Sequence, residues 1–214
     1  MVQRYDHVRH IRLGRFGTTD VVRCSSGCRG PAVLKTFGLA LLGDARGAEA
    51  EVAALAQLRH PHLVEIFEAF REGGVLCVVS EYADAGHVAS RIDGARREGC
   101  PIDPALAGQW LAQAAMALGY VHRSGALHRD LRSRRLLLRS SGHLLVGGLA
   151  TSAPLARALA PSRPDIEALR YLSPELVRAS AEHSRASDLW ALGVVVFELL
   201  ALRAPFEDEN PRAL

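Results

Sequence analysis

Residues 127–146 read LHRDLRSRRLLLRSSGHLLV, and this stretch combines the densest basic run of the chain with two short apolar runs. The segment LLLRSSGHLLV, residues 136–146, predicts a hairpin of two strands, because its apolar runs flank a polar turn that contains glycine. Leucines interrupt the basic run and are expected to pack inward. The formal net charge is only +3, and charge runs are usually solvated faces, so the composition argues against nucleic acid as a partner.

The chain before this stretch predicts a strand-rich lobe with one helix. Short segments that alternate or are rich in β-branched residues are typical of strands, whereas GAEAEVAALAQLRH is typical of a helix that ends near HPH. We expect strands over residues 10–14, 20–24, 32–37, 63–70 and 74–82, and the helix over 47–60.

The chain around and after the stretch predicts a mainly helical lobe. A long amphipathic helix is expected over 104–125, and a mostly apolar one over 187–202. The fold class is therefore α+β, a small antiparallel lobe (1–80), a hinge (81–86) and a helical lobe (87–214). A ligand cleft is expected between the lobes.

Composition restricts the setting of the protein. The N-terminus is too charged for a secretory signal, and the longest apolar stretch, residues 189–202, is too short to span a membrane and carries Glu198. The four cysteines indicate neither a disulfide framework nor a zinc site with four ligands. We expect an intracellular, cytoplasmic protein.

Lys35 is the only lysine of the chain. In its strand, a period of two places Val33 and Lys35 on one face, with Ala32 and Leu34 on the other. On the helix over 47–60, Glu51 shares a face with two leucines, Leu55 and Leu58. A carboxylate on such a face is expected to meet a cation.

Five segments occur in the order of a protein kinase signature: AVLK, the glutamate of EVAALAQLRHPHLV, LHRDL, LSPEL and SDLWALG. The chain therefore resembles a eukaryotic-type protein kinase domain over about residues 5 to 206. Details such as HPHLVEIFEAF, Ser133 and RYLSPEL are most similar to the NIMA-related serine/threonine kinases.

The resemblance implies a two-lobe kinase fold and a set of site residues. Lys35 would contact the phosphates of ATP and be held by Glu51, and Asp130 would be the residual catalytic base. A compact ammonium suits that position better than a planar arginine. The remaining cofactor-binding positions would be Leu13, Gly14, Val21, Val33, Glu81 and Leu137.

The chain departs from the family at both metal ligands. The asparagine five residues after the catalytic aspartate is Arg135. The aspartate of the DFG motif aligns with Gly148, or with Val146 after a shift of two residues, and neither side chain offers an oxygen. No Asp or Glu occurs from Leu131 to Pro164, so magnesium is not expected to bind, and the resemblance leaves no metal site.

Two further motifs are degenerate. The glycine loop offers Gly14, then Phe16 and Thr19, or Gly17 if two residues are deleted, and no register supplies all three glycines. The threonine that contacts the catalytic aspartate in the family is Ala168.

Other positions are retained. By resemblance, Asp188 and Trp190 belong to the motif that braces the catalytic loop, although a buried aspartate there could equally be architectural. Apolar packing between the lobes would come from Leu55, His128 and Leu149, and Ser80 would open a back pocket. Phosphorylation could occur at Thr151, Ser152 or Ser162.

Two functions follow from these motifs. The first is a pseudokinase that binds or regulates a protein partner, with weak ATP binding at most. The alternative is an active serine/threonine kinase that uses Lys35, Glu51 and Asp130 on a protein substrate. The sequence also ends just after the apolar helix over 189–202, so we expect an exposed apolar patch there and poor stability of the isolated chain.

Overall fold

The computed structural model describes residues 4–14, 17–25, 30–41, 44–149, 166–178 and 182–206. The chain divides into two compact units. The first contains the described residues up to Arg59 together with Val64–Tyr82. The second contains His60–Leu63 and the described residues from Ala83 onwards.

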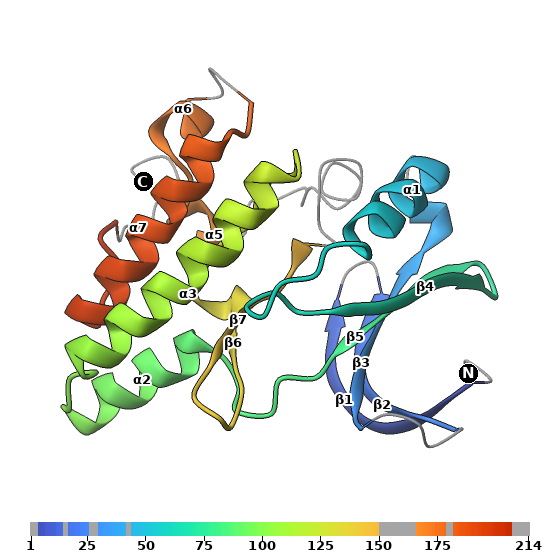
Figure 1. Cartoon of the computed structure of the whole chain (residues 1–214), viewed down its shortest axis with the longest axis horizontal. Coiled ribbons are helices and arrows are strands. Elements are labelled where there is room, and N and C mark those ends of the chain that lie inside the picture. Colours follow the sequence, from blue (N-terminus) through green and yellow to red (C-terminus); the bar gives the residue numbers. More distant parts are fainter. Residues whose placement is uncertain are drawn as a thin grey trace. The chain divides into compact units, whose positions relative to one another are not determined.

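The first unit is a five-stranded antiparallel sheet with one α-helix (Figure 1). Its strand order is β1-β2-β3-β5-β4, so hairpins join β1 to β2, β2 to β3 and β4 to β5. All five predicted strands are present. Their bounds are β1 Tyr5–Gly14, β2 Gly17–Cys24, β3 Ala32–Gly38, β4 Ile66–Glu72 and β5 Val75–Glu81.

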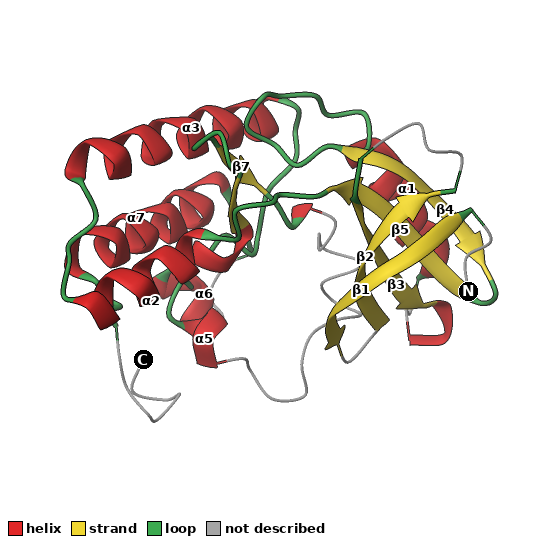
Figure 2. Ribbon diagram, turned by 90° about the horizontal axis from the view of Figure 1, so that it is seen from below, coloured by secondary structure: helices red, strands yellow, loops and turns green. Residues whose placement is uncertain are grey.

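The sheet buries one face in a small core. Ala32 and Leu34 of β3 pack there with Val22, Cys77 and Val79. This confirms the predicted alternation in β3, because Val33 and Lys35 are only half-buried. The Tyr5 hydroxyl of β1 donates a hydrogen bond to Glu68 of β4, although these are the two edge strands. The sheet is therefore strongly curled, as Figure 2 shows.

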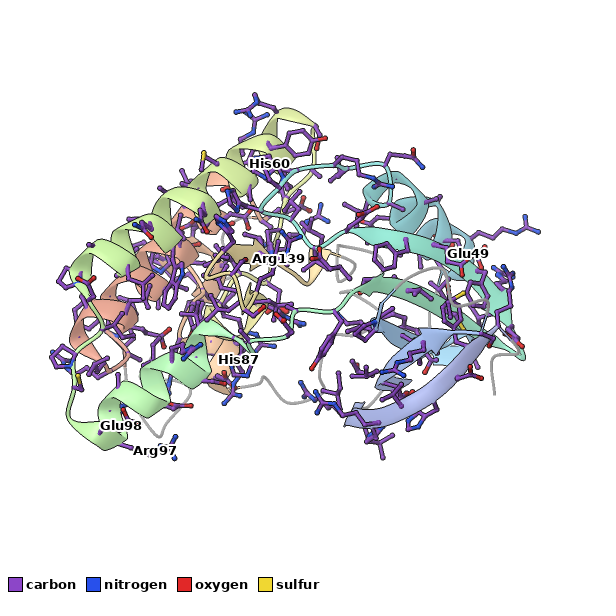
Figure 3. The ribbon with its side chains drawn as sticks, turned by 60° about the horizontal axis from the view of Figure 1, so that its bottom comes forward. Glu49, His60, His87, Arg97, Glu98 and Arg139 are labelled. Atoms are coloured by element: carbon purple, nitrogen blue, oxygen red, sulfur yellow. The ribbon has the colours of Figure 1, made fainter. Side chains whose placement is uncertain are left out.

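Helix α1, Ala45–Leu55, begins at Asp44, whose side chain accepts a hydrogen bond from the Gly47 backbone at 2.9 Å. On this helix Glu49, labelled in Figure 3, forms an ion pair with Arg71 of β4. The helix ends five residues earlier than predicted, and Leu58 lies beyond it. The chain tightens at this end, since the backbone N–H of Leu58 bonds the carbonyl of Leu55, three residues back.

The second unit is mainly helical, as predicted, and α3 and α7 run side by side in Figures 1 and 2. Sequence analysis predicted α3, α7 and the β6–β7 hairpin but missed α2, which follows a His87 cap. A single turn of 3-10 helix, Ser133–Arg135, precedes the hairpin. The elements are α2 Val88–Glu98, α3 Pro104–Arg123, β6 Leu136–Leu138, β7 Leu144–Val146, α5 Ile166–Leu169, α6 Pro174–Val177 and α7 Arg185–Ala201.

Helix α7 is buried on one side only. Val195 and Leu199 are in the core, whereas Leu189 and Leu200 are more than half exposed among the described residues. Trp190 stacks on Phe206 with ring centroids 5.9 Å apart. Helix α7 therefore presents exposed apolar side chains at Leu189 and Leu200. No helix in the described ranges combines the length and apolar character that crossing a bilayer requires.

Candidate functional site

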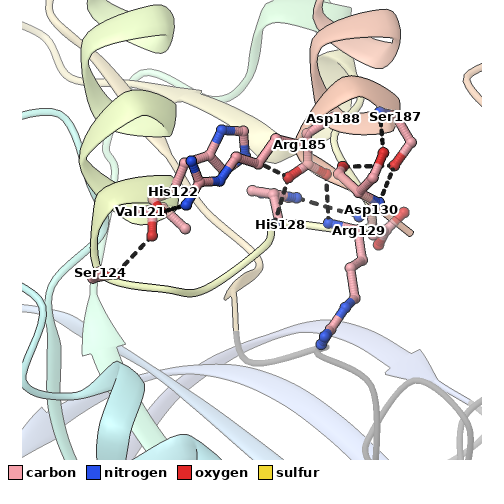
Figure 4. A network of polar contacts seen from close by, with 10 residues as sticks. Val121, His122, Ser124, His128, Arg129, Asp130, Arg185, Ser187 and Asp188 are labelled. Carbon is pink, nitrogen blue, oxygen red and sulfur yellow. Dashed lines mark hydrogen bonds and ion pairs between the residues drawn. The ribbon is translucent and has the colours of Figure 1, made fainter. Parts of the chain in front are cut away.

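The loop that carries Asp130 is held by Asp188, which lies in the first turn of α7 (Figure 4). The Oδ2 atom of Asp188 accepts hydrogen bonds from the His128 backbone N–H at 2.9 Å and from His122 Nε2 at 2.8 Å. Its Oδ1 atom accepts one from the Arg129 backbone N–H at 2.8 Å. Arg129 has a positive φ of 63°, a strained conformation that these bonds stabilise. Asp188 therefore fixes the path of the loop.

His128 is fully buried in the same loop. Its Nε2 atom donates to the carbonyl of Gly147 at 2.9 Å, and its Nδ1 atom accepts from the Asp130 backbone N–H at 3.3 Å. Burial lowers the pKa of His128, because the interior disfavours the charged imidazolium. The neutral ring thus links the backbone of Asp130 to the segment after β7 through one hydrogen bond on each side.

Two arginines contact the carboxylate of Asp130. Arg135 donates to Oδ2 through Nε at 2.9 Å and through Nη2 at 2.5 Å. Arg132 Nε lies 3.2 Å from Oδ1. The two guanidinium groups come from the ends of one short turn, in which the Arg135 N–H bonds the carbonyl of Arg132 at 2.8 Å. Both oxygens of Asp130 are therefore engaged by positive charge.

The side chain of Arg135 lies against Gly148. A Cβ atom at position 148 would be 2.9 Å from Cδ and 3.2 Å from Nε of Arg135, and Gly148 has a φ of 90°. The alternative position from the shifted alignment, Val146, is buried in β7 and pairs with Leu136. Of the two candidates, Gly148 is the one that lies beside the charged group.

The described residues around Asp130 offer few oxygen ligands to a divalent metal ion. Hard cations such as Mg²⁺ need oxygen ligands, and Gly148 has no side chain to supply one. Arg135 brings a permanent positive charge into contact with the carboxylate of Asp130. Among the described residues, no three His, Cys, Asp or Glu side chains are grouped so that they could hold a metal.

Ala168 lies with Asp130 and Arg132 around a pocket of about 120 Å³. Tyr171 also lines this pocket, and its hydroxyl lies 2.9 Å from Ser133 Oγ and donates to Glu198 of α7 at 2.6 Å. Burial raises the pKa of both Tyr171 and Glu198. This polar chain, Ser133–Tyr171–Glu198, is a second connection between the segment after Asp130 and α7.

The remaining candidate residues lie in the first unit, apart from Leu137, which is in β6 opposite Leu145. Lys35 is in the middle of β3, between Thr19 of β2 and Val78 of β5, and Glu51 is half-buried on α1 of the same unit. The other positions are Leu13 in β1, 76 % exposed, Val21, Val33 and Glu81 in β2, β3 and β5, and buried Ser80 in β5.

The glycine-loop hairpin closes with the pair Gly14 and Gly17, which leaves two residues between the strands. A Cβ at Gly17 would lie only 1.7 Å from the carbonyl oxygen of Thr36, so this position requires glycine. Phe16 and the possible phosphorylation sites Thr151, Ser152 and Ser162 lie outside the described residues.

Sequence reasoning missed three contributors to the site. Arg132 was noted only as part of a basic run, and His122 and Glu198 were not linked to the catalytic loop. His122 is 66 positions from Asp188, and the Glu198–Tyr171 contact spans 27 positions. No local pattern in the sequence predicts contacts between residues so far apart. The one available signal was Glu198, because a charged residue within an apolar helix is expected to have a polar partner.

Comparison with known proteins agrees with the kinase motifs of the sequence. The protein kinase domain matches residues 5–213. The chain is 31% identical to the serine/threonine-protein kinase Nek1 of Mus musculus over 215 residues, 100% of this chain and 18% of the relative. It is 28% identical to Nek5 of Homo sapiens, over 100% of this chain and 30% of the relative.

A further relative is the Aurora/IPL1-related protein kinase 2 of Caenorhabditis briggsae, 30% identical over 94% of this chain and 65% of the relative. The chain thus spans less than two thirds of the length of each of these relatives. The match covers both units, including the loop around Asp130 and the helix that holds it. This chain belongs to the protein kinase domain family.

Proposed function

We propose that this serine/threonine kinase-family domain is a pseudokinase, a binding module that contacts or regulates a protein partner without transferring phosphate. The observation that carries the proposal is the contact of Arg135 and Arg132 with both carboxylate oxygens of Asp130. A general base needs an oxygen that can accept the proton of a substrate hydroxyl. Here Oδ2 already accepts two N–H donors of Arg135, and Oδ1 lies 3.2 Å from the charged Arg132.

The missing metal ligands support the same proposal. Phosphoryl transfer depends on positioning and on neutralising the charge of the moving phosphoryl group, and the metal ions supply most of that neutralisation. Arg135 and Gly148 occupy the two positions from which the family holds its metal. Kinases in general use ATP with Mg²⁺, whereas for this chain we propose weak ATP binding at most, without magnesium.

The residues proposed to bind the nucleotide are Lys35, paired with Glu51, and the other expected cofactor-binding positions, Leu13, Gly14, Val21, Val33, Glu81 and Leu137. The lobes would be residues 1–80 and 87–214, with the hinge at 81–86. Lys35 in β3 and Glu51 in α1 belong to the same unit, which is compatible with this pairing.

The alternative is an active serine/threonine kinase that uses Lys35, Glu51 and Asp130. One observation favours it, namely that Asp188 holds the backbone of the Asp130 loop through two hydrogen bonds, from the N–H groups of His128 and Arg129. An intact scaffold would let Asp130 act if Arg135 released it.

Transfer of labelled γ-phosphate from ATP, with Mg²⁺ and then Mn²⁺, separates the two functions. A generic protein substrate is incubated with the unmodified chain, with Lys35→Met and with Asp130→Asn. We expect the three proteins to give the same background incorporation. Incorporation by the unmodified chain that both substitutions abolish would establish the active kinase instead.

A further inference from the structure

Asp130, Arg132 and Arg135 form a cluster with a net positive charge, beside the carboxylate of Asp188 that accepts from the loop backbone. Asp130 contributes one negative charge, whereas Arg132 and Arg135 contribute two positive charges within 3.2 Å of it. All three side chains are at least three-quarters buried, with exposed fractions of 25 %, 11 % and 24 %. The chain from Leu131 to Pro164 supplies no further carboxylate. A net positive charge in a shielded site attracts anions.

The guanidinium group of Arg135 lies close to Gly148, the position at which the family has its metal-binding aspartate. The Cζ atom of Arg135, the centre of its guanidinium group, lies 3.5 Å from the position of a Cβ atom on residue 148. A carboxylate at 148 would therefore project into the volume that Arg135 fills. The two departures from the family are physically coupled, because the glycine makes room for the arginine.

A guanidinium group suits a phosphate. It carries five N–H donors in a planar fork that matches two phosphate oxygens, and Asp130 accepts from only two of its nitrogens. The ion pair with Asp130 also orients the fork in advance, which lowers the entropy lost when a ligand binds.

We propose that Arg135 is a tethered cation that replaces the divalent ion, so that this site binds a polyphosphate chain, such as that of a nucleoside triphosphate, without metal. The inference rests on the proposed function, because it takes the site to be one for binding rather than transfer. No bond is formed or broken. Magnesium weakens the interaction, since it neutralises the phosphates that Arg135 would contact.

Isothermal titration calorimetry on the full chain tests this proposal, with ATP and with inorganic tripolyphosphate as separate probes in EDTA. We expect both probes to bind in EDTA and both to bind less tightly in excess Mg²⁺. Arg135→Gln should weaken both by about tenfold or more, the usual effect of losing hydrogen bonds to a charged group. The affinity of Arg135→Lys should lie between those of the unmodified chain and Arg135→Gln, because lysine keeps the positive charge but lacks the planar fork of N–H donors.

Arg134→Gln is the matched control. It removes the same charge from the neighbouring residue, whose guanidinium contacts Glu167 at 2.5 Å rather than Asp130. We expect it to change the affinity less than threefold, and the far-UV circular dichroism of each variant checks its folding. Binding that requires Mg²⁺, no binding in EDTA, or equal effects of Arg134→Gln and Arg135→Gln would overturn the proposal.

The outcome is independent of the phosphotransfer assay. If neither probe binds in EDTA while no phosphate is transferred, the tethered cation is wrong and the pseudokinase stands. If phosphate is transferred in an Lys35-dependent manner, the proposed function fails, and the EDTA titration still reports on Arg135.

Discussion

Gly148 is subject to two separate constraints at the scale of a single residue. Its φ of 90° lies in the left-handed region, where side chains with a Cβ are strained. The Cδ atom of Arg135 would also lie 2.9 Å from that Cβ. The first constraint belongs to the backbone, whereas the second disappears if Arg135 is shortened, so the two can be measured separately.

We predict that Gly148→Ala lowers the free energy of unfolding by about 2 kcal/mol, of which the backbone strain accounts for about 1 kcal/mol. In an Arg135→Ala background, Gly148→Ala should lower the free energy of unfolding only by the part that is due to backbone strain. Urea denaturation of the four proteins in this double-mutant cycle measures both parts. Gly108→Ala in α3 is the control, since no described atom beyond its own stretch of helix lies within 4 Å of its Cβ position, and it should be neutral or slightly stabilising. Identical costs in both backgrounds would contradict the contact with Arg135.

His128 gives a pH dependence at the same scale. Its pKa is lowered in the folded protein by burial, from an ordinary value of about 6.5. The stability that depends on the neutral ring is therefore present above pH 6.5 and is lost as the pH falls below it. One excess proton on the unfolded chain corresponds to at most about 1.4 kcal/mol per pH unit.

We predict that the free energy of unfolding falls between pH 7.5 and 5.5, and that His128→Gln makes this fall smaller. The fall should not vanish, because burial also lowers the pKa values of His60, His87 and His183. Urea titrations at several pH values give the slope, with His143→Gln, an exposed position, as control. An unchanged slope in His128→Gln would exclude His128 as the source.

At the scale of elements, α7 organises the loop that carries Asp130 through Asp188, which is only 2 % exposed. Its three hydrogen bonds connect α7 with the loop and with the end of α3. In Asp188→Asn, one oxygen becomes an amide that donates, so it faces an N–H donor instead of accepting from it.

We predict that Asp188→Asn lowers the free energy of unfolding by about 3 kcal/mol, because buried donors lose their charged acceptor. Asp93→Asn in α2, where the side chain is exposed, should change it by less than about 0.5 kcal/mol. Chemical denaturation compares the two. A small effect of Asp188→Asn would mean that water or a neighbouring group replaces the lost acceptor.

The elements also show what the sequence can predict. Alternation located the strands, and in β3 it assigned Ala32 and Leu34 to the buried face, because a period of two follows directly from strand geometry. Helix α2 was missed because four arginine or glutamate side chains among its residues obscure the apolar pattern. The early end of α1 depends on local hydrogen bonds that no periodicity reveals.

For the candidate site too, the sequence predicts which residues are present but not how their side chains are arranged. Alignment with the family motifs located Asp130, Arg135 and Gly148 and predicted that a metal would not fit. It could not predict that Arg135 turns toward Asp130, since the direction of a side chain depends on the space around it. That space is provided by Gly148, thirteen residues later in the chain.

At the scale of the whole molecule, each unit has its own core. The first unit buries Leu76 on β5, and the second buries Leu118 on α3, both at 1 % exposure. Both tryptophans, Trp110 and Trp190, belong to the second unit. Tryptophan fluorescence therefore reports on the second unit, whereas far-UV circular dichroism reports on both.

We predict that the two signals give different urea midpoints, because cores that are separate can unfold in separate steps. Leu76→Ala should shift the circular dichroism transition and leave the fluorescence midpoint unchanged. Leu118→Ala should shift the fluorescence midpoint, with a loss of about 2–5 kcal/mol expected for truncation of a buried leucine. The two variants are matched controls for each other, since each removes the same atoms from an equally buried position. If Leu76→Ala moved the fluorescence midpoint as far as Leu118→Ala does, the chain would unfold as one cooperative body, and the division into two cores would carry no energetic meaning.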